Sequence, residues 1–178
     1  MAIKPTILKA QLDISDMDRH HYESHTLAIA RHSSETDERV MVRLLAYALN
    51  AHEFLSFSDG IDSADDPALW QKDLTGKIEV WIDVGQPDEK RILKACGRAD
   101  EVVIYSYARS SATWWEQVAP KVERARNLSV IQIKDSPALA KLVERNMDFQ
   151  CLIQEGQIFL TSGEDNYEVE MVKLRERS

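Results

Sequence analysis

The stretch Lys77-Ile78-Glu79-Val80-Trp81-Ile82-Asp83-Val84-Gly85-Gln86-Pro87-Asp88 decides the fold of this chain. Apolar side chains recur at every second residue from Ile78 to Val84, which is the period of a β-strand with two different faces. Gly85 and Pro87 end the strand, and Pro87 suits the first turn of a following helix because that position needs no backbone N–H donor. Asp83 is therefore expected at the carboxyl end of a strand, where α/β proteins commonly hold a ligand or a metal ion. A simple turn cap at Asp83 fits the same spacing.

The composition is that of a globular protein. Of the 178 residues, 44% are hydrophobic and 29% are charged, which is ordinary for a folded domain. The length fits one core, and no Gly-, Ser- or Pro-rich linker divides the chain, so we expect a single domain over residues 1–178. No apolar run approaches the ~20 residues that span a bilayer, and the N-terminus lacks a signal-peptide pattern. We therefore expect no membrane association and a cytoplasmic location.

The net charge of −8 argues against indiscriminate binding to nucleic acid, because phosphate contacts need a basic face. A local basic face is compatible with it. Arg91, Lys94 and Arg98 would share one stripe of the helix that follows Asp83, with Lys90 at its edge. A solvated helix face gives the same pattern. Nucleic acid thus remains open as a partner.

Hydrophobic periodicity predicts a mixed α/β fold in which a parallel centre is wrapped by antiparallel strands from both ends of the chain. The segment 101–107 is nearly continuous in apolar residues, as a central parallel strand would be. The terminal segments each need a partner sheet, so we expect residues 5–31 and 148–174 to pair with each other. The predicted strands are 5–15, 25–31, 55–58, 77–84, 101–107, 128–133, 148–154, 157–161 and 167–174. The predicted helices are 36–52, 87–96, 114–126 and 136–144, the third with a kink at Pro120. An acidic loop over 62–66 and a short helical turn over 67–70 are also expected.

Several common site types are absent from the sequence. It has no G-x-S-x-G, no P-loop and no G-x-G-x-x-G, and its six glycines are scattered singly. His20, His21, His25 and His32 gather near the N-terminus, but 20, 21 and 25 lack a standard zinc-ligand spacing, and we do not assign them a metal. Cys96 and the distant Cys151 have no CxxC spacing and lie in apolar patterns, where burial raises a thiol pKa and disfavours a nucleophile.

Carboxylates are the remaining candidates for chemistry. Glu38 lies in the first turn of the first long helix, Asp65 and Asp66 precede Pro67, and Asp83 ends its strand. A Mg²⁺ site takes oxygen ligands from such separate elements and leaves positions for water and a phosphate. A nearby lysine would offset the developing negative charge. These acids therefore define a hypothetical Mg²⁺ site.

Three blocks of the sequence resemble the YaeQ family of bacterial proteins. They are Arg31-His32-Ser33-Ser34-Glu35-Thr36-Asp37-Glu38-Arg39, Asp65-Asp66-Pro67-Ala68-Leu69-Trp70, and the run from Trp81 to Arg91 with Lys94-Ala95-Cys96. The resemblance covers essentially the whole chain. It implies a variant of the PD-(D/E)XK nuclease fold, whose core is a helix, a three-stranded piece, a helix and a further strand. It carries no established cellular role, so it bears on the fold more than on the function.

The resemblance also implies roles for the acids. Asp83 resembles the acid of the (D/E)-x-K element, Asp66 or its neighbour Asp65 resembles the preceding Asp, and Glu38 resembles the helix glutamate. All four are then candidate metal ligands.

The lysine of that motif is missing. Two residues after Asp83 the chain has Gly85, followed by Gln86. Some members of the superfamily supply the lysine from the next helix, and Lys94 is the first candidate because it lies about two turns into the predicted helix. The other candidates for this catalytic position are Lys90, Arg91 and Gln86.

Two functions from different classes follow from the resemblance. The first is a Mg²⁺-dependent phosphodiesterase or nuclease, a metal-binding hydrolase. The second is a catalytically silent nuclease-like fold that serves as a binding or regulatory module. The retained acids favour the first, and Gly85 with the net charge of −8 favours the second.

Overall fold

The computed structural model describes residues 4–58 and 65–178 and divides into two compact units. Unit 1 comprises Met1–Ala51 and Asp135–Met171, and unit 2 comprises His52–Lys134 and Val172–Ser178. The class is mixed α/β, as predicted, with two mixed sheets and four α-helices in the described part of the chain. One domain over residues 1–178 stays a prediction.

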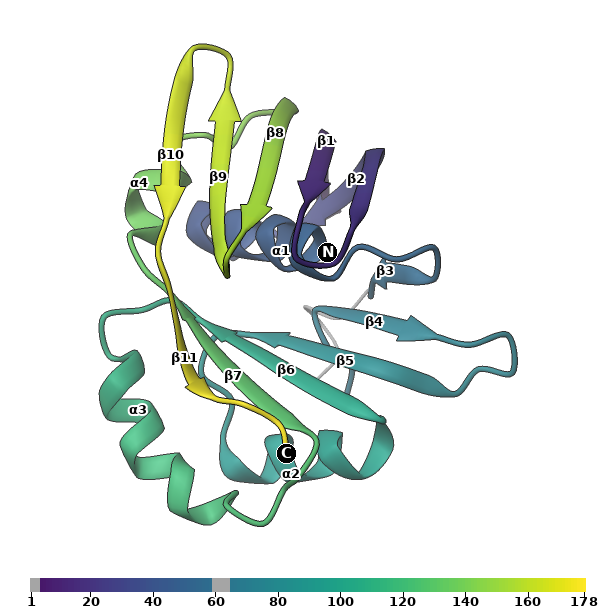
Figure 1. Cartoon of the computed structure of the whole chain (residues 1–178), viewed down its shortest axis with the longest axis vertical. Coiled ribbons are helices and arrows are strands. Elements are labelled where there is room, and N and C mark those ends of the chain that lie inside the picture. Colours follow the sequence, from purple (N-terminus) through teal and green to yellow (C-terminus); the bar gives the residue numbers. More distant parts are fainter. Residues whose placement is uncertain (1–3, 59–64) are drawn as a thin grey trace. The chain divides into compact units, whose positions relative to one another are not determined.

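Unit 1 contains a five-stranded sheet in the order β10-β9-β8-β1-β2, with β2 at one edge (Figure 1). β1 and β2 form the predicted antiparallel hairpin, and β1 runs parallel to β8. This pairing confirms that segments from both ends of the chain share a sheet. Every second residue of β1 is buried, so its alternating pattern places one apolar face inward. The bounds are β1 Thr6–Asp16, β2 His21–Arg31, β8 Asn146–Gln154, β9 Gln157–Ser162 and β10 Asp165–Val169.

Two helices belong to unit 1. α1 (Asp37–Asn50) begins at the N-cap Thr36, whose hydroxyl accepts a hydrogen bond from the Arg39 amide. α1 contacts β1 and α4 (Ser136–Ala140). The prediction extended α4 to residue 144, but the amides of 142 and 143 close single i→i−3 turns, so the α-helical hydrogen bonding stops.

Unit 2 contains a six-stranded sheet in the order β11-β7-β6-β5-β4-β3. β6 lies between β5 and β7 and runs parallel to both, so the predicted central parallel strand is confirmed. β3, β4 and β5 form an antiparallel piece beside it. The bounds are β3 Leu55–Phe57, β4 Leu69–Lys72, β5 Ile78–Val84, β6 Glu101–Ser106, β7 Leu128–Ile133 and β11 Met171–Arg175.

Two predicted elements are wrong. The expected helical turn over 67–70 does not form, and β4 begins at Leu69, because Trp70 pairs with Trp81 of β5 and their rings meet edge to face at 6.3 Å. The expected strand over 167–174 is two strands, since β10 ends at the buried Val169 and β11 joins the other sheet. Most of the expected acidic loop, residues 62–64, lies outside the described residues.

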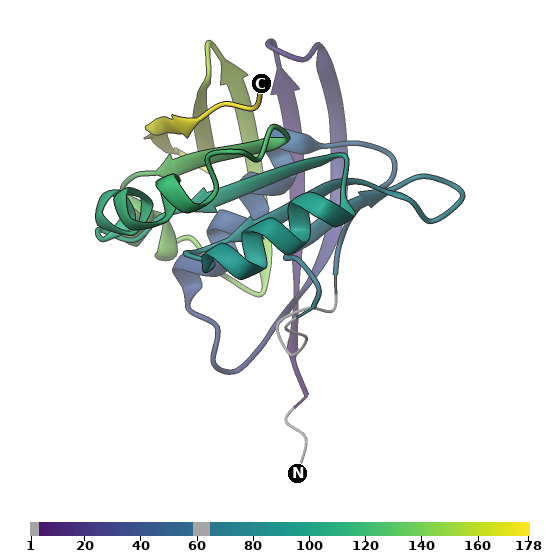
Figure 2. The ribbon, with the colours of Figure 1, turned by 90° about the horizontal axis from the view of Figure 1, so that it is seen from below.

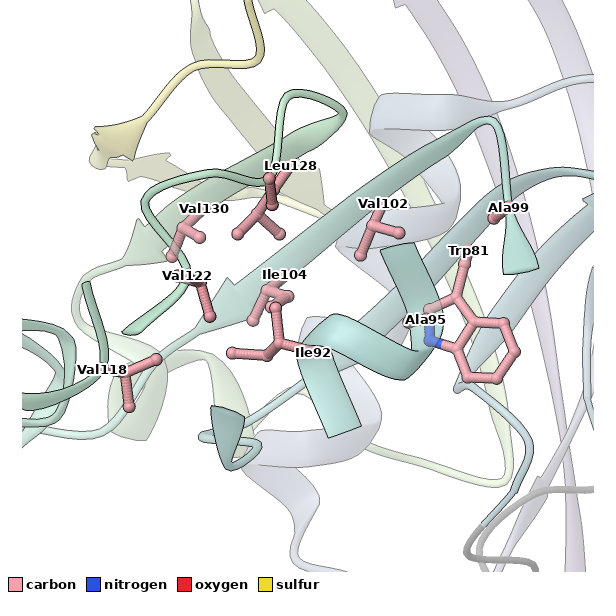
Figure 3. Packing of buried hydrophobic residues seen from close by; sticks show 11 residues of the cluster. Trp81, Ile92, Ala95, Ala99, Val102, Ile104, Val118, Val122, Leu128 and Val130 are labelled. Atoms are coloured by element: carbon pink, nitrogen blue, oxygen red, sulfur yellow. The ribbon is translucent and has the colours of Figure 1, made fainter. Parts of the chain in front are cut away.

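Helices α2 (Glu89–Arg98) and α3 (Ser111–Val118) cover one face of the unit 2 sheet (Figure 2). Apolar side chains of both helices pack on β5, β6 and β7 (Figure 3), and each fully buried aliphatic side chain contributes roughly 1.5–3 kcal/mol. The predicted helix to residue 126 ends at Val118 and continues as the 3₁₀ turn η1 (Ala119–Lys121) because Pro120 has no N–H to donate. The labelled cluster comprises Trp81, Ile92, Ala95, Ala99, Val102, Ile104, Val118, Val122, Leu128 and Val130.

None of the helices in residues 4–58 and 65–178 has the length and apolar character needed to cross a bilayer.

Candidate functional site

The end of β5 places Asp83 where the sequence predicts it. Asp83 pairs with Ile104 of the parallel neighbour β6, and its side chain is only 6% exposed. Gly85 then turns the chain with a φ of +117°, a conformation open mainly to glycine, and its amide donates to Tyr105 O at 2.8 Å. Asp88 caps α2 by accepting from the Arg91 amide at 2.8 Å. The turn therefore sets the first helical residues beside the strand-end carboxylate.

Arg91 holds the Asp83 carboxylate at both oxygens. Its Nε donates to Oδ2 and its Nη2 donates to Oδ1, each at 3.0 Å. The same Nη2 donates to the backbone carbonyl of Asp66 at 2.7 Å. The hydrogen bonds to Asp83 hold the pKa of the Arg91 guanidinium above its ordinary value. This fork geometry is the strong, directional form of an Arg–carboxylate pair.

Two further cations of α2 bind the segment before Pro67. Lys94 Nζ donates to the Asp65 carboxylate at 3.0 Å, and Arg98 Nη1 donates to the Asp65 carbonyl at 2.9 Å. The hydrogen bond from Lys94 and then its charge lower the pKa of Asp65. Arg98 also lies 5.0 Å from the centroid of the Trp81 ring, within the range of a cation–π contact. We call Arg91, Lys94 and Arg98 the α2 cationic stripe.

The structure therefore brings Asp83 and the 65–66 segment to one place, linked by Arg91. The cation on Asp83 is Arg91, whereas Lys94, our first candidate, bonds Asp65. Lys94 lies about one turn farther along α2, some 4.5 Å from Arg91 along the axis. Its side chain is 62% exposed, compared with 30% for Arg91.

The other predicted residues have local contacts. Glu38 belongs to unit 1, where its carboxylate accepts from Ser136 Oγ at 2.8 Å and joins α1 to the start of α4. Gln86 Nε2 donates to Ser110 Oγ at 2.9 Å and so ties the strand-end turn to the start of α3. Lys90 is exposed at the start of α2.

Both cysteines behave as the sequence indicates. Cys151 is buried, and burial raises the pKa of its thiol to about 12. Burial also raises the pKa of the half-buried Cys96 thiol. Neither thiol is poised as a nucleophile, since the thiolate is the reactive form.

The sequence analysis noted His21 and His25 but assigned them no metal, and it did not connect them with Glu23 of the same strand, β2. Their ligand atoms all lie within 4.8 Å of one another. The predicted strand began at residue 25, whereas β2 begins at His21. Residues i, i+2 and i+4 of a strand share one face, so the signal was present and needed only the correct strand start.

Comparison with known proteins finds relatives that align with this chain over their whole length. The family model described as YaeQ protein matches residues 1–171. The YaeQ protein of Escherichia coli K12 is 40% identical over 182 residues, and that of Salmonella typhi is 38% identical over 181 residues. Both alignments cover 100% of this chain and 100% of the relative.

Solved structures show the same fold. The crystal structure of the YaeQ protein from Xanthomonas axonopodis pv. citri superposes with a TM-score of 0.93 at 42% identity and covers 96% of this chain and 98% of that one. The YaeQ protein from Pseudomonas syringae gives a TM-score of 0.93 at 35% identity, with 97% of each chain covered. On the family model, the full-length relatives and the shared fold together, this chain belongs to the YaeQ family.

Proposed function

We propose that this protein is a catalytically silent nuclease-like fold that binds the phosphate backbone of a nucleic acid through α2. The observation that carries the proposal is the two-point hydrogen bonding of Arg91 to Asp83. The order α1–β3–β4–β5–α2–β6 supports the nuclease-like core, because it repeats the helix, three-stranded piece, helix and strand that the resemblance implies.

Arg91 supplies Asp83 with the positive charge that a bound metal ion would otherwise provide. Mg²⁺ binds oxygen ligands in a near-ideal octahedron, and both oxygens of Asp83 already accept hydrogen bonds from Arg91. Breaking a buried ion pair by removing one partner costs about 3–5 kcal/mol, and the partial exposure of Arg91 reduces this figure. A cation built into the chain therefore neutralises the acid that catalysis would require.

Lys94 and Arg98 of the α2 cationic stripe are suited to reversible binding of an anion. Lys94 and Asp65 are 62% and 74% exposed, and exposed ion pairs of this kind are weak. A phosphate oxygen can replace Asp65 on Lys94 and Arg98 while Arg91 stays on Asp83. In this account Asp65 is an internal competitor for the anion.

The proposal is tested by measuring binding and cleavage with one labelled oligonucleotide, single- and double-stranded, in Mg²⁺ or Mn²⁺. We expect weak, salt-dependent binding and no product. Lys94→Ala should weaken binding of both the single- and the double-stranded form and lower the salt slope by roughly 1. Asp65→Asn should tighten binding. Asp83-dependent product would overturn the proposal.

The chain offers a matched control for Lys94. Lys77 is 61% exposed and pairs with Asp100 at 3.1 Å, nearly the same exposure and distance as the Lys94–Asp65 pair. Lys77→Ala should leave affinity and salt slope unchanged. An equal loss in both variants would mean that binding follows net charge and not the α2 stripe.

A Mg²⁺-dependent phosphodiesterase or nuclease is the second candidate. It is favoured by the gathering of Asp83 and the 65–66 segment at one strand end with a cation beside them. Asp83 and Asp66 or Asp65 would then be the metal ligands within unit 2. The oligonucleotide assay with wild type and Asp83→Ala separates the two functions.

A further inference from the structure

The residues His21, Glu23 and His25 form a cluster on the edge strand β2, on the side of the sheet that faces α1. They alternate with Tyr22 and Ser24, so their side chains share one face of the strand. The His21 and His25 side chains are 18% and 14% exposed, whereas Glu23 is 65% exposed. Two half-buried imidazoles are thus joined by a carboxylate at the solvent side.

The ligand atoms of this cluster are spaced as a metal ion would require. His21 Nε2 lies 3.0 Å from His25 Nε2, and the Glu23 Oε2 atom lies 4.0 Å from the first and 3.7 Å from the second. Ligand atoms about 2.1 Å from a tetrahedral zinc ion stand about 3.4 Å apart. The three separations lie on either side of that value and within about 0.6 Å of it, so small side-chain shifts would complete the geometry.

A second contact orients the inner imidazole. Tyr47 of α1 lies with its hydroxyl 3.2 Å from His25 Nδ1, and the two rings meet edge to face. Metal-binding histidines commonly use the other ring nitrogen in this way, which fixes the tautomer and aims the free lone pair. With Nδ1 engaged by Tyr47, Nε2 of His25 is directed at His21 and Glu23.

The electrostatic setting favours a cation over two protonated rings. Burial, and then the neighbouring His21, lower the pKa of His25, which keeps the imidazole in the neutral form that binds metals. Asp16 lies directly opposite His21 in the β1–β2 register and is buried. Its carboxylate pairs with Arg19 at 3.7 Å, so Glu23 is the acidic member of the cluster.

We propose that His21, Glu23 and His25 bind one zinc ion or a similar divalent transition metal, with a fourth position open to solvent. Two imidazole nitrogens and one carboxylate oxygen suit zinc and its neighbours, whereas Mg²⁺ and Ca²⁺ take oxygen ligands. The site is separate from the acids of unit 2 and does not depend on the proposed binding function. A hydrogen-bonded imidazole pair without a metal is the alternative arrangement.

The test is calorimetric titration of the full-length, untagged chain with ZnCl₂ after dialysis against a chelator. We expect one ion per chain, at least 100-fold weaker binding in His21→Gln and His25→Gln, and about 10-fold weaker binding in Glu23→Gln. Co²⁺ in place of zinc should give the visible absorption band of a tetrahedral site in the wild type and not in His25→Gln. Excess Mg²⁺ should not displace zinc.

His20→Asn is the matched control, because His20 is the exposed neighbour of His21 and its φ of +56° is one that Asn tolerates. It should bind zinc like the wild type. Far-UV circular dichroism checks that each variant is folded, and Glu23→Gln, at an exposed side chain, keeps the test decisive if His25→Gln unfolds. Absence of saturable binding, or equal binding in wild type, His21→Gln and Glu23→Gln, would overturn the site.

Discussion

At the scale of single residues, the ion pair between Asp83 and Arg91 determines the charge at the end of β5. The carboxylate is buried, and the guanidinium that neutralises it comes from the first turn of the adjoining helix. An acid that would bind a metal in an active nuclease is here half of an ion pair. The acidic residue thus has a structural reason to be present, whether or not the chain has catalytic activity.

The first prediction concerns Asp83→Asn in the metal-free protein. The substitution removes the charge that Arg91 faces, and a hydrogen bond to a charged group is worth roughly 1.5–3 kcal/mol. Because Arg91 is 30% exposed, water recovers part of that energy, and we expect the free energy of unfolding to fall by about 1–2 kcal/mol in urea titration. Asp100→Asn, at a surface pair, should change it little. Higher stability in Asp83→Asn would instead indicate repulsion among the acids.

The second prediction concerns pH and His25. Burial holds the pKa of His25 below its unfolded value of 6.5, so below about pH 6.5 the unfolded chain binds more protons than the folded chain. Stability is therefore full above pH 6.5 and falls as the pH drops toward the folded pKa. The charged or titratable groups that face the ring are His21, Glu23 and Tyr47.

The measurement is the melting temperature of the metal-free protein between pH 7.5 and 5. We expect a decline below pH 6.5 that is shallower in His25→Gln, and an unaltered decline in His20→Asn. A His25→Gln profile parallel to that of the wild type would contradict the assigned origin of the pH dependence.

At the scale of elements, patterning predicted those strands and helices whose periodicity matches their packing. β1, α1, β5, β6 and β7 lie close to their predicted ranges because each has one or two apolar faces that its neighbours bury. β4 was missed because Pro67 suggested a helical turn, whereas pairing of Trp70 with Trp81 decides the outcome. Tertiary contacts of this kind are invisible in local sequence.

The candidate site was predictable in part. The strand-end position of Asp83 follows from alternation and from Gly85. The choice of Arg91 over Lys94 does not, because it depends on how far each side chain reaches from its turn of α2. The β2 cluster depends on a strand beginning four residues earlier than its apolar pattern.

The third prediction compares two glycines, one in the turn between β5 and α2 and one near the C-terminal end of α2. Gly85 ends β5 with a φ of +117°, and Gly97 lies in α2 without a positive φ; a Cβ at either position meets nothing within 4 Å. Gly85→Ala should therefore destabilise through backbone strain alone, by about 1–3 kcal/mol. Gly97→Ala should stabilise by about 0.5–1 kcal/mol. Urea unfolding of both variants is the measurement, and equal effects would contradict the assigned role of Gly85.

At the scale of the whole molecule, the C-terminal segment contributes to both sheets. β10 forms one edge of the unit 1 sheet, and β11 forms one edge of the unit 2 sheet. The sequence predicted that the chain ends pair but assigned all the C-terminal strands to one meander. The apolar alternation at Tyr167, Val169 and Met171 shifts by one residue to Val172 and Leu174, and the prediction of a single strand overlooked this shift.

The fourth prediction is that deletion of residues 164–178 lowers the melting temperature and the cooperativity of the whole chain. The deletion removes β10 and β11, and so exposes an inner strand edge in each unit. Differential scanning calorimetry measures both quantities. A truncated chain that melts as sharply as the full chain and at the same temperature would contradict this role of the C-terminus.

We propose that Arg91, and not a metal ion, neutralises the Asp83 carboxylate. The most direct measurement is the ¹H–¹⁵N resonance of Arg91 Nε, assigned by its loss in Arg91→Gln, during titration of the full-length protein with Mg²⁺ and an oligonucleotide. The account predicts a protected resonance that stays unchanged at saturating Mg²⁺, while resonances of Lys94 and Arg98 respond to the oligonucleotide. Release of the Arg91 resonance by Mg²⁺ in the wild type, dependent on Asp83, would contradict the account.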